Sequence, residues 1–172
     1  MKIKFLSIVF FVLISIPVFS SEKIAYLDVE KIMQDSVAGK SIIAQIKKKR
    51  ELVISNFKKK EKQIIEKEKK LISQKNILSK EEFEKKLISL RNDISTFQKE
   101  RTKSANEIAA KRVKASTKLI SKLTPILEDY SKKNSIKIIV QKKHIVMGRT
   151  EDDITKDILD IMNKTVKNIK VD

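Results

Sequence analysis

The sequence predicts an α+β protein that is mostly α-helical, in which a small body of β-strands carries one long antiparallel helical hairpin. Charged residues make up 35% of the 172 residues, and the chain has only two Gly and two Pro. Long helices tolerate this composition, whereas sandwiches and barrels need more turn residues. Apolar residues recur at helical spacing on both sides of residues 73–86, while strand-like apolar runs lie near the two ends of the mature chain.

Residues 1–20 differ in character from the rest. Lys2 and Lys4 precede an almost unbroken apolar run over residues 5–19, and Val18 and Ser20 suit the small-residue rule for cleavage. This pattern is typical of a secretory signal peptide that is cut after about Ser20. An uncleaved membrane anchor is the alternative, although the run is short of the roughly 20 residues that a spanning helix needs. Cysteine is absent, which suits an oxidising compartment. We therefore expect export, to the periplasm in a bacterium.

The mature chain opens with a strand and a short helix. Both faces of 23-KIAYLDV-29 are apolar, so we expect a strand that is buried on both sides. Its two faces carry Ile24 and Tyr26 on one side and Ala25, Leu27 and Val29 on the other. After the strand we expect a short helix and a bend over residues 29–40, which contain Gly39. Asp28 or Asp35 can provide the cap in this region.

The first helix of the hairpin is predicted over residues 41–76. Its apolar side chains fall seven residues apart, with Arg50 in the one missing place: Ile43, Phe57, Ile64, Leu71 and Leu78. A companion row starts with Ile46 and Val53 and continues as Lys60 and Lys67, so the apolar stripe thins toward the turn.

The second helix begins at Ser79, because Ser79 and Glu82 have the spacing of a capping box, and Asn76 is the expected stop of the first helix. It runs past Lys118 and carries an apolar stripe in which Arg101 takes one place: Phe83, Leu87, Leu90, Ile94, Phe97, Ala105, Ile108, Ala115 and Leu119. Two such seams joined at residues 76–79 predict an antiparallel pair of helices, each roughly 55–60 Å long.

The return to the body predicts three further features. Pro125 should kink the second helix or make it restart with Thr124 as a cap. The apolar runs 138–140 and 145–147 flank a QKK turn and predict a β-hairpin. Thr150 with Asp153 should open a last helix, whose apolar face is formed by Ile154, Ile158, Ile161 and Ile169. The body is thus predicted as residues 21–40 plus 120–172, and the arm as residues 41–119.

Positive charge is concentrated on the arm. Residues 40–118 contain 24 Lys and Arg against 10 Asp and Glu, whereas the rest of the mature chain is almost neutral. A general bias toward Lys is the alternative explanation. A cationic field of this kind attracts polyanions or acidic surfaces. Because export argues against nucleic acid, the remaining partners are anionic lipid, cell-wall polymer or a negatively charged polypeptide.

Residues suited to catalysis are scarce. His144 is the only histidine and lies in a predicted strand, and there is no cysteine to complete a zinc site. The acidic run Glu151, Asp152 and Asp153 lies at a predicted helix start, where the dipole favours carboxylates. We therefore expect neither an enzyme nor a bound cofactor.

The predicted body is too small to cover its own strands, since one hairpin and one further strand leave edges unpaired. A closed homo-oligomer that shares the strands as a common core would solve this problem. The arms would then project together and enclose a cavity with apolar patches and a basic field.

The residues resemble the Skp/OmpH family of periplasmic chaperones. The resemblance covers the mature chain in order: 23-KIAYLDVEKIMQDSVAGKS-41, the basic hairpin, and 136-IKIIVQKKHIVMGRTEDDITKDILDIMN-163. It implies a jellyfish-shaped homotrimer, with a β-strand body and three tentacles. It also implies that the cavity between the tentacles holds unfolded outer-membrane proteins without ATP until they are inserted.

Two sets of site residues are predicted. The arm surface expected to bind the client comprises Phe57, Lys58, Lys59, Lys60, Ile64, Lys69, Lys70, Leu71, Lys75, Phe83, Lys85, Lys86 and Phe97. The surface expected in the oligomeric body comprises Ile24, Tyr26, Leu27, Ile138, Ile139, Val140, Ile145, Val146 and Met147. The alternative for the apolar arm residues is that they hold the two helices together, and for the lysines that they form a solvated face.

Two other function classes stay open. The first is a polyanion-binding module of the envelope that recognises lipopolysaccharide-like lipid or cell-wall polymer. The second is a structural coiled-coil spacer, which would protect no unfolded protein from aggregation.

Overall fold

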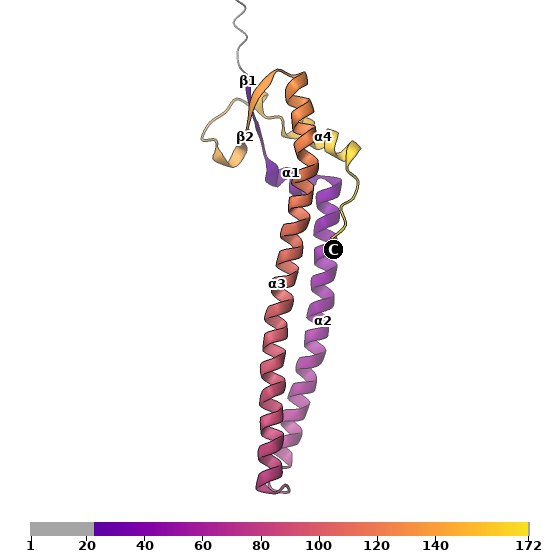
Figure 1. The fold of residues 1–172 in the computed structure, drawn as a ribbon, viewed down its shortest axis with the longest axis vertical. Coiled ribbons are helices and arrows are strands. Elements are labelled where there is room, and N and C mark those ends of the chain that lie inside the picture. Colours follow the sequence, from indigo (N-terminus) through magenta and orange to yellow (C-terminus); the bar gives the residue numbers. More distant parts are fainter. Residues whose placement is uncertain (1–22, 172) are drawn as a thin grey trace, which may run out of the picture.

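The computed structural model describes residues 23–171, and the predicted signal peptide lies outside the described residues. The elements follow in the order β1 (Lys23–Leu27), α1 (Val29–Asp35), α2 (Val37–Ser73), α3 (Lys80–Lys133), β2 (Ile136–Gln141) and α4 (Thr155–Thr165), with short 3-10 turns at Lys142–His144 and Thr150–Asp152. Figure 1 shows α2 and α3 side by side as one long arm, which extends from a body that contains the other elements. The predicted mostly helical α+β fold is confirmed.

Two caps define where the body ends and the arm begins. Asp28 caps α1, because its Oδ1 accepts a hydrogen bond from the backbone N–H of Lys31. Ser36 caps α2 through a hydrogen bond that its Oγ accepts from the N–H of Gly39. The alternative cap Asp35 is wrong, since its carboxylate pairs with Lys31 at 2.6 Å. The arm helix therefore starts at Val37, four residues before the predicted start.

The tip of the arm is a short turn over residues 74–79. Helix α2 ends at Ser73, so Asn76 lies inside the turn and is not the helix stop. The capping box is confirmed: the Ser79 hydroxyl accepts from the Glu82 N–H, and the Glu82 carboxylate accepts from the Ser79 N–H. Helix α3 contains 54 residues, which corresponds to about 80 Å of rise.

The seam between α2 and α3 is buried at its two ends. Toward the tip, Leu71 and Leu90 are buried. At the body, Ile42 is 3% exposed whereas the predicted seam residue Ile43 is 52% exposed. The prediction of Ile43 was wrong because the first turns of α2 pack into the body core, and this contact selects the face that carries Ile42. Between these ends the rings of Phe57 and Phe97 meet edge to face, with centroids 5.6 Å apart.

Pro125 does not interrupt the return helix, so the predicted restart with Thr124 as a cap is wrong. Helix α3 continues through Pro125 to Lys133, and the Thr124 hydroxyl donates to the carbonyl of Ile120. A proline inside a helix removes one backbone hydrogen bond. Pro125 is exposed, so water can reach the carbonyl left without its helical partner. Leu123 and Ile126, on either side, pack in the body core and hold the helix there.

The predicted β-hairpin is wrong, because residues 145–147 form no strand. Instead β2 pairs with β1 in parallel, with Ala25 opposite Ile139 and Tyr26 opposite Val140. After β2 the chain enters a 3-10 turn, and the Lys142 ammonium reaches Asp153 at 2.8 Å. The backbone N–H of Ile154 then donates to the carbonyl of Tyr26. The chain returns past the sheet as a loop held by β1, and none of residues 142–171 pairs antiparallel with the sheet.

One face of the two-stranded sheet is buried by the chain itself. Ala25 and Leu27 are buried, but Ile24 is 54% and Ile138 is 53% exposed. The expectation that β1 is buried on both sides is therefore wrong for the single chain. The two exposed isoleucines lie opposite each other in the register and form one apolar surface.

The last helix starts at Thr155, five residues after the predicted start at Thr150. Asp153 stops the preceding turn, because its carboxylate accepts hydrogen bonds from the Thr155 N–H and hydroxyl. The Thr155 hydroxyl also accepts from the Asp28 N–H, which joins the end of β1 to the start of α4. Of the predicted apolar face, Ile154 and Ile158 are buried, Ile161 is half-buried, and Ile169 is buried but lies beyond the helix.

A second link joins α4 to the arm. The Tyr130 hydroxyl on α3 donates to the Asp157 carboxylate on α4 at 2.6 Å. This hydrogen bond and partial burial raise the pKa of Tyr130 to about 12. The hydroxyl therefore stays protonated at physiological pH. The link fixes α4 against the body end of the long helix.

We predict that Gly39→Ala destabilises the fold, although alanine is normally favoured in a helix by about 1 kcal/mol. A Cβ at position 39 would lie 2.1 Å from the backbone oxygen of Met33. Because this oxygen belongs to the backbone, it cannot move aside as the end of a flexible side chain could. The expected loss in the free energy of unfolding is about 1–3 kcal/mol, measured by urea denaturation. Gly148→Ala is the comparison, because its Cβ would meet a side chain, the ring of Tyr26, instead of backbone. A G39A protein as stable as the parent would contradict this packing.

We predict a pH-dependent contribution from Asp153. Burial acts to raise the pKa of Asp153, but hydrogen bonds from Lys142 and Thr155 outweigh it and hold the pKa below its ordinary value of 3.8. A lowered pKa stabilises the fold above that ordinary value, and the stability is lost as the pH falls through the folded-state pKa. Asp153→Asn should therefore be less stable than the parent at pH 7 by urea denaturation, and the difference should shrink at about pH 3. A difference that is constant with pH would refute this role.

Candidate functional site

The apolar residues predicted to bind a client lie mainly in the seam. Leu71 is buried, and Phe57, Ile64, Phe83 and Phe97 are half-buried. The ring contact of Phe57 with Phe97 shows that these two side chains hold the helices together. The half-buried side chains remain accessible along the flanks of the seam, so a partner can contact them only there.

The eight predicted arm lysines are all exposed: Lys58, Lys59, Lys60, Lys69, Lys70, Lys75, Lys85 and Lys86. Three of them have partners within the chain. Lys60 pairs with Glu100 across the seam, Lys85 pairs with Glu81 one turn away, and Lys86 donates to Gln74. For the other five, the structure over residues 23–171 shows no ion pair.

Two ion pairs cross the seam among the described residues, one level with the two phenylalanines and one nearer the tip. Lys60 meets Glu100 beside the ring of Phe57, and Lys67 meets Asp93 at 2.6 Å. All four side chains keep more than a third of their surface exposed. Exposed ion pairs of this kind contribute about 0–1 kcal/mol each to stability. Their main effect is to favour one relative orientation of the two helices.

On the body side of the phenylalanines the two helices leave a groove of about 990 Å³. Its floor is apolar, with Val53 and Ile108 on opposite helices, and its rim carries three arginines: Arg50, Arg101 and Arg112. We call it the arginine groove. It is a feature that the sequence-based site missed, although Arg50 and Arg101 stood out as charged residues in apolar stripes. Volumes of this size are typical of ligand-binding clefts.

The opposite flank of the seam has a smaller hollow of about 350 Å³, which shares Val53 and Phe57 with the arginine groove. Here the charges balance, because Lys60 and Lys103 face Glu100 and Glu107. We call it the balanced flank. The two flanks thus share part of their apolar floor and differ in their charge.

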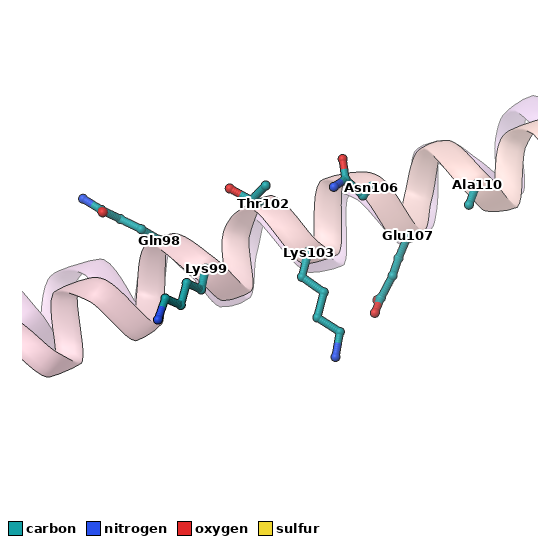
Figure 2. A pocket seen from close by; sticks show the side chains of 7 residues that line it. All are labelled: Gln98, Lys99, Thr102, Lys103, Asn106, Glu107 and Ala110. Carbon is teal, nitrogen blue, oxygen red and sulfur yellow. The ribbon is translucent and has the colours of Figure 1, made fainter.

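A third hollow lies along the outside of α3. Figure 2 shows that its lining residues all belong to this one helix: Gln98, Lys99, Thr102, Lys103, Asn106, Glu107 and Ala110. The amide and hydroxyl side chains extend to one side of the helix and the charged ones to the other. Since no second element forms an opposing wall, this surface cannot enclose a ligand.

The predicted oligomer residues separate into a buried and an exposed group. Leu27 belongs to the core of the chain, and Tyr26, Ile139, Val140 and Ile145 are half-buried. The exposed group is Ile24, Ile138, Val146 and Met147, of which Met147 is 91% exposed. The Tyr26 hydroxyl donates to the Arg149 carbonyl, which holds this loop beside the sheet. The body therefore presents an apolar surface that the chain does not cover.

Groups suited to metal binding do not cluster in the described part of the chain, residues 23–171. His144 is exposed in the 3-10 turn after β2. Among the acidic residues at 151–153, the Asp153 carboxylate binds Lys142 and Thr155. Across the same residues, no helix combines the length and hydropathy needed to cross a bilayer.

Comparison with known structures finds the same architecture. A crystal structure of a candidate outer membrane chaperone (OmpH-like) from Caulobacter crescentus CB15 superposes with a TM-score of 0.81 at 14% sequence identity. The match covers 88% of this chain and 89% of that one, so the likeness includes both arm and body. Comparison with curated protein sequences finds no match.

A protein-family model provides the assignment by sequence. The model described as outer membrane protein (OmpH-like) matches residues 23–162, which run from the start of β1 to the end of the buried part of α4. This match covers most of the chain and includes both strands and the whole arm. The protein belongs to the OmpH-like family.

Proposed function

We propose that this protein is an ATP-independent holdase chaperone of the periplasm. It binds unfolded outer-membrane proteins between basic helical arms and prevents their aggregation before membrane insertion. The observation that carries the proposal is the arm itself: two long helices whose surface is cationic and whose seam exposes apolar edges, on a chain of the OmpH-like family. An unfolded chain offers many weak sites, and an extended arm can meet several of them at once.

The proposal includes a homotrimer. It is supported by the apolar surface that Ile24, Ile138, Val146 and Met147 leave uncovered on the body. It is also supported by the two-stranded sheet, since isolated strand pairs are marginally stable in water. Copies that share this surface would place their arms around a common cavity. The trimeric number itself comes from the family resemblance.

The polyanion-binding module is the second candidate, and the cationic excess of the arm favours it. The two candidates separate when arm lysines are replaced by glutamate. A holdase that works mainly through apolar contacts would keep part of its protection of unfolded protein. A polyanion-binding module would lose its binding to anionic lipid or cell-wall polymer completely.

The experiment that tests the proposal is suppression of aggregation. An outer-membrane β-barrel protein unfolded in urea is diluted into buffer with or without the mature protein, and light scattering is followed. We expect the mature protein to keep scattering low without ATP. Scattering unchanged at excess mature protein would refute the holdase function.

We predict that salt weakens the capture of a client. Raising the salt concentration from about 0.05 M to about 0.5 M shortens the Debye length to a few Å and screens the exposed lysines. The protein concentration needed for half-suppression of scattering should therefore rise severalfold. Capture that does not change over this range would remove the electrostatic part of the mechanism.

We predict that Ile138→Asp breaks the oligomer. A charge on the exposed body surface would have to be buried without a partner if copies associate there. The variant should elute later than the parent in size-exclusion chromatography and protect the unfolded client poorly. Ile72→Asp is the matched control, since Ile72 is 65% exposed near the tip of the arm. Equal elution of I138D and the parent would place the interface elsewhere.

A further inference from the structure

We propose that the arginine groove binds extended client segments in which apolar and acidic side chains alternate. This inference rests on the proposed function and assigns it a place on the arm. It identifies a specific site on one flank of the seam, whereas the general cationic surface would attract acidic segments anywhere. The occupant is a polypeptide, and its carboxylates are the groups that the arginines recognise.

The groove exists because large apolar residues are missing from the middle of the seam. Arg50 takes an apolar place on α2, and Arg101 and Ala105 follow Phe97 in the stripe of α3. Long charged and short side chains cannot fill the space between two helices as leucine does. The apolar side chains around the gap consequently stay accessible, with Ile54 45% and Val113 66% exposed.

The charges at the groove have no partners within the described chain. Over residues 23–171 the structure shows no ion pair for Arg50, Lys58, Arg101 or Arg112, and Glu61 is the one carboxylate in the lining. Guanidinium groups bind carboxylates through paired hydrogen bonds. Lys60 and Lys67 differ, since they pair with Glu100 and Asp93 across the seam. The arginine groove is therefore a part of the seam where an apolar floor and cations without ion pairs are offered together.

The spacing of the arginines favours an extended peptide over a lipid. Arg101 and Arg112 are 11 residues apart on α3, or about 16 Å. Because Lys60 faces Glu100 and the helices are antiparallel, Arg50 lies opposite a point between them. The three arginines are thus spread over about 16 Å of the arm, a length that roughly five residues of an extended peptide cover. A lipid with one anionic head group would engage only one end of this row.

The test uses a fluorescein-labelled ten-residue peptide that alternates valine with glutamate, and a second peptide with glutamine in place of glutamate. Binding is measured by fluorescence anisotropy with the full mature protein. The variant Arg50→Gln/Arg101→Gln/Arg112→Gln should lose about tenfold in affinity for the acidic peptide, since three exposed ion pairs are removed. The wild-type protein should bind the glutamine peptide about as weakly as this variant binds the acidic one.

The matched control is Lys48→Gln/Lys62→Gln/Lys114→Gln, which removes the same charge from exposed arm positions outside the groove lining. It should change the affinity by less than about threefold, because these exposed lysines do not line the groove and their charges are screened by salt. An equal loss in both variants, or no loss in either, would overturn the groove as the site. The inference also falls if the peptide does not bind, or if only vesicles of anionic lipid bind in an arginine-dependent manner.

A second readout locates the peptide directly. The chain has no cysteine, so Ala109→Cys places a single thiol in the groove and Ala110→Cys places one on the outside of α3. Both alanines are exposed neighbours on one helix. The acidic peptide should slow alkylation of A109C severalfold and leave A110C unchanged. Equal protection of the two thiols, or protection of neither, would contradict binding in the groove.

Failure of this inference can be distinguished from failure of the proposed function. Aggregation suppression is measured with the same wild-type protein. If it suppresses aggregation but the arginine variant binds peptide normally, the groove assignment is wrong and the holdase stands. If it does not suppress aggregation, the holdase is wrong whatever the peptide results are.

Discussion

The parallel pairing of β1 with β2 determines how the rest of the molecule is arranged. Strand β1 precedes the arm in the sequence and β2 follows it, so the helices between them have to leave the body and return to it. Ser36 and the Tyr130–Asp157 hydrogen bond fix the departing and returning helices at the body. The pair is nonetheless incomplete, since Ile24 and Ile138 stay exposed on one face. The same contact that builds the arm therefore leaves a surface that association can cover.

Along the arm, the packing of the seam changes at Phe57 and Phe97. On the tip side the helices are held by the buried Leu71 and Leu90 and by the Lys67–Asp93 ion pair across the seam. On the body side the arginines and alanines leave a groove whose charges are unpaired. A hairpin that is closed at both ends and open between them can keep its shape and still offer a binding surface. In the proposed function, this division lets a thin helical pair hold a client without a large core of its own.

Strong local signals predicted the helices, whereas the strand pairing depended on contacts between distant residues. The Ser79–Glu82 capping box and the helical stripes predicted the two long helices, because their physics is local. The β-hairpin was wrong because residues 145–147 resemble a strand in composition, while their position is set by Tyr26 and Asp153 from elsewhere in the chain. Pro125 was misjudged because packing of its neighbours outweighs one lost hydrogen bond. The arginine groove was missed because Arg50 and Arg101 were each taken only as an interruption of an apolar stripe. The periodicity of one helix does not show that such a position lies beside the corresponding position on the other helix.

The central claim is that several copies share one body and project their arms around a common space. Dipolar distance measurement by electron spin resonance tests it most directly, with one nitroxide on Asn76→Cys at the tip of each arm. Because the chain has no other cysteine, any dipolar coupling must join different subunits. The account predicts coupling among three spins per particle, with distances that shift when an unfolded β-barrel protein is captured. A complete absence of coupling at micromolar protein would mean one arm per particle, and it would contradict the shared body.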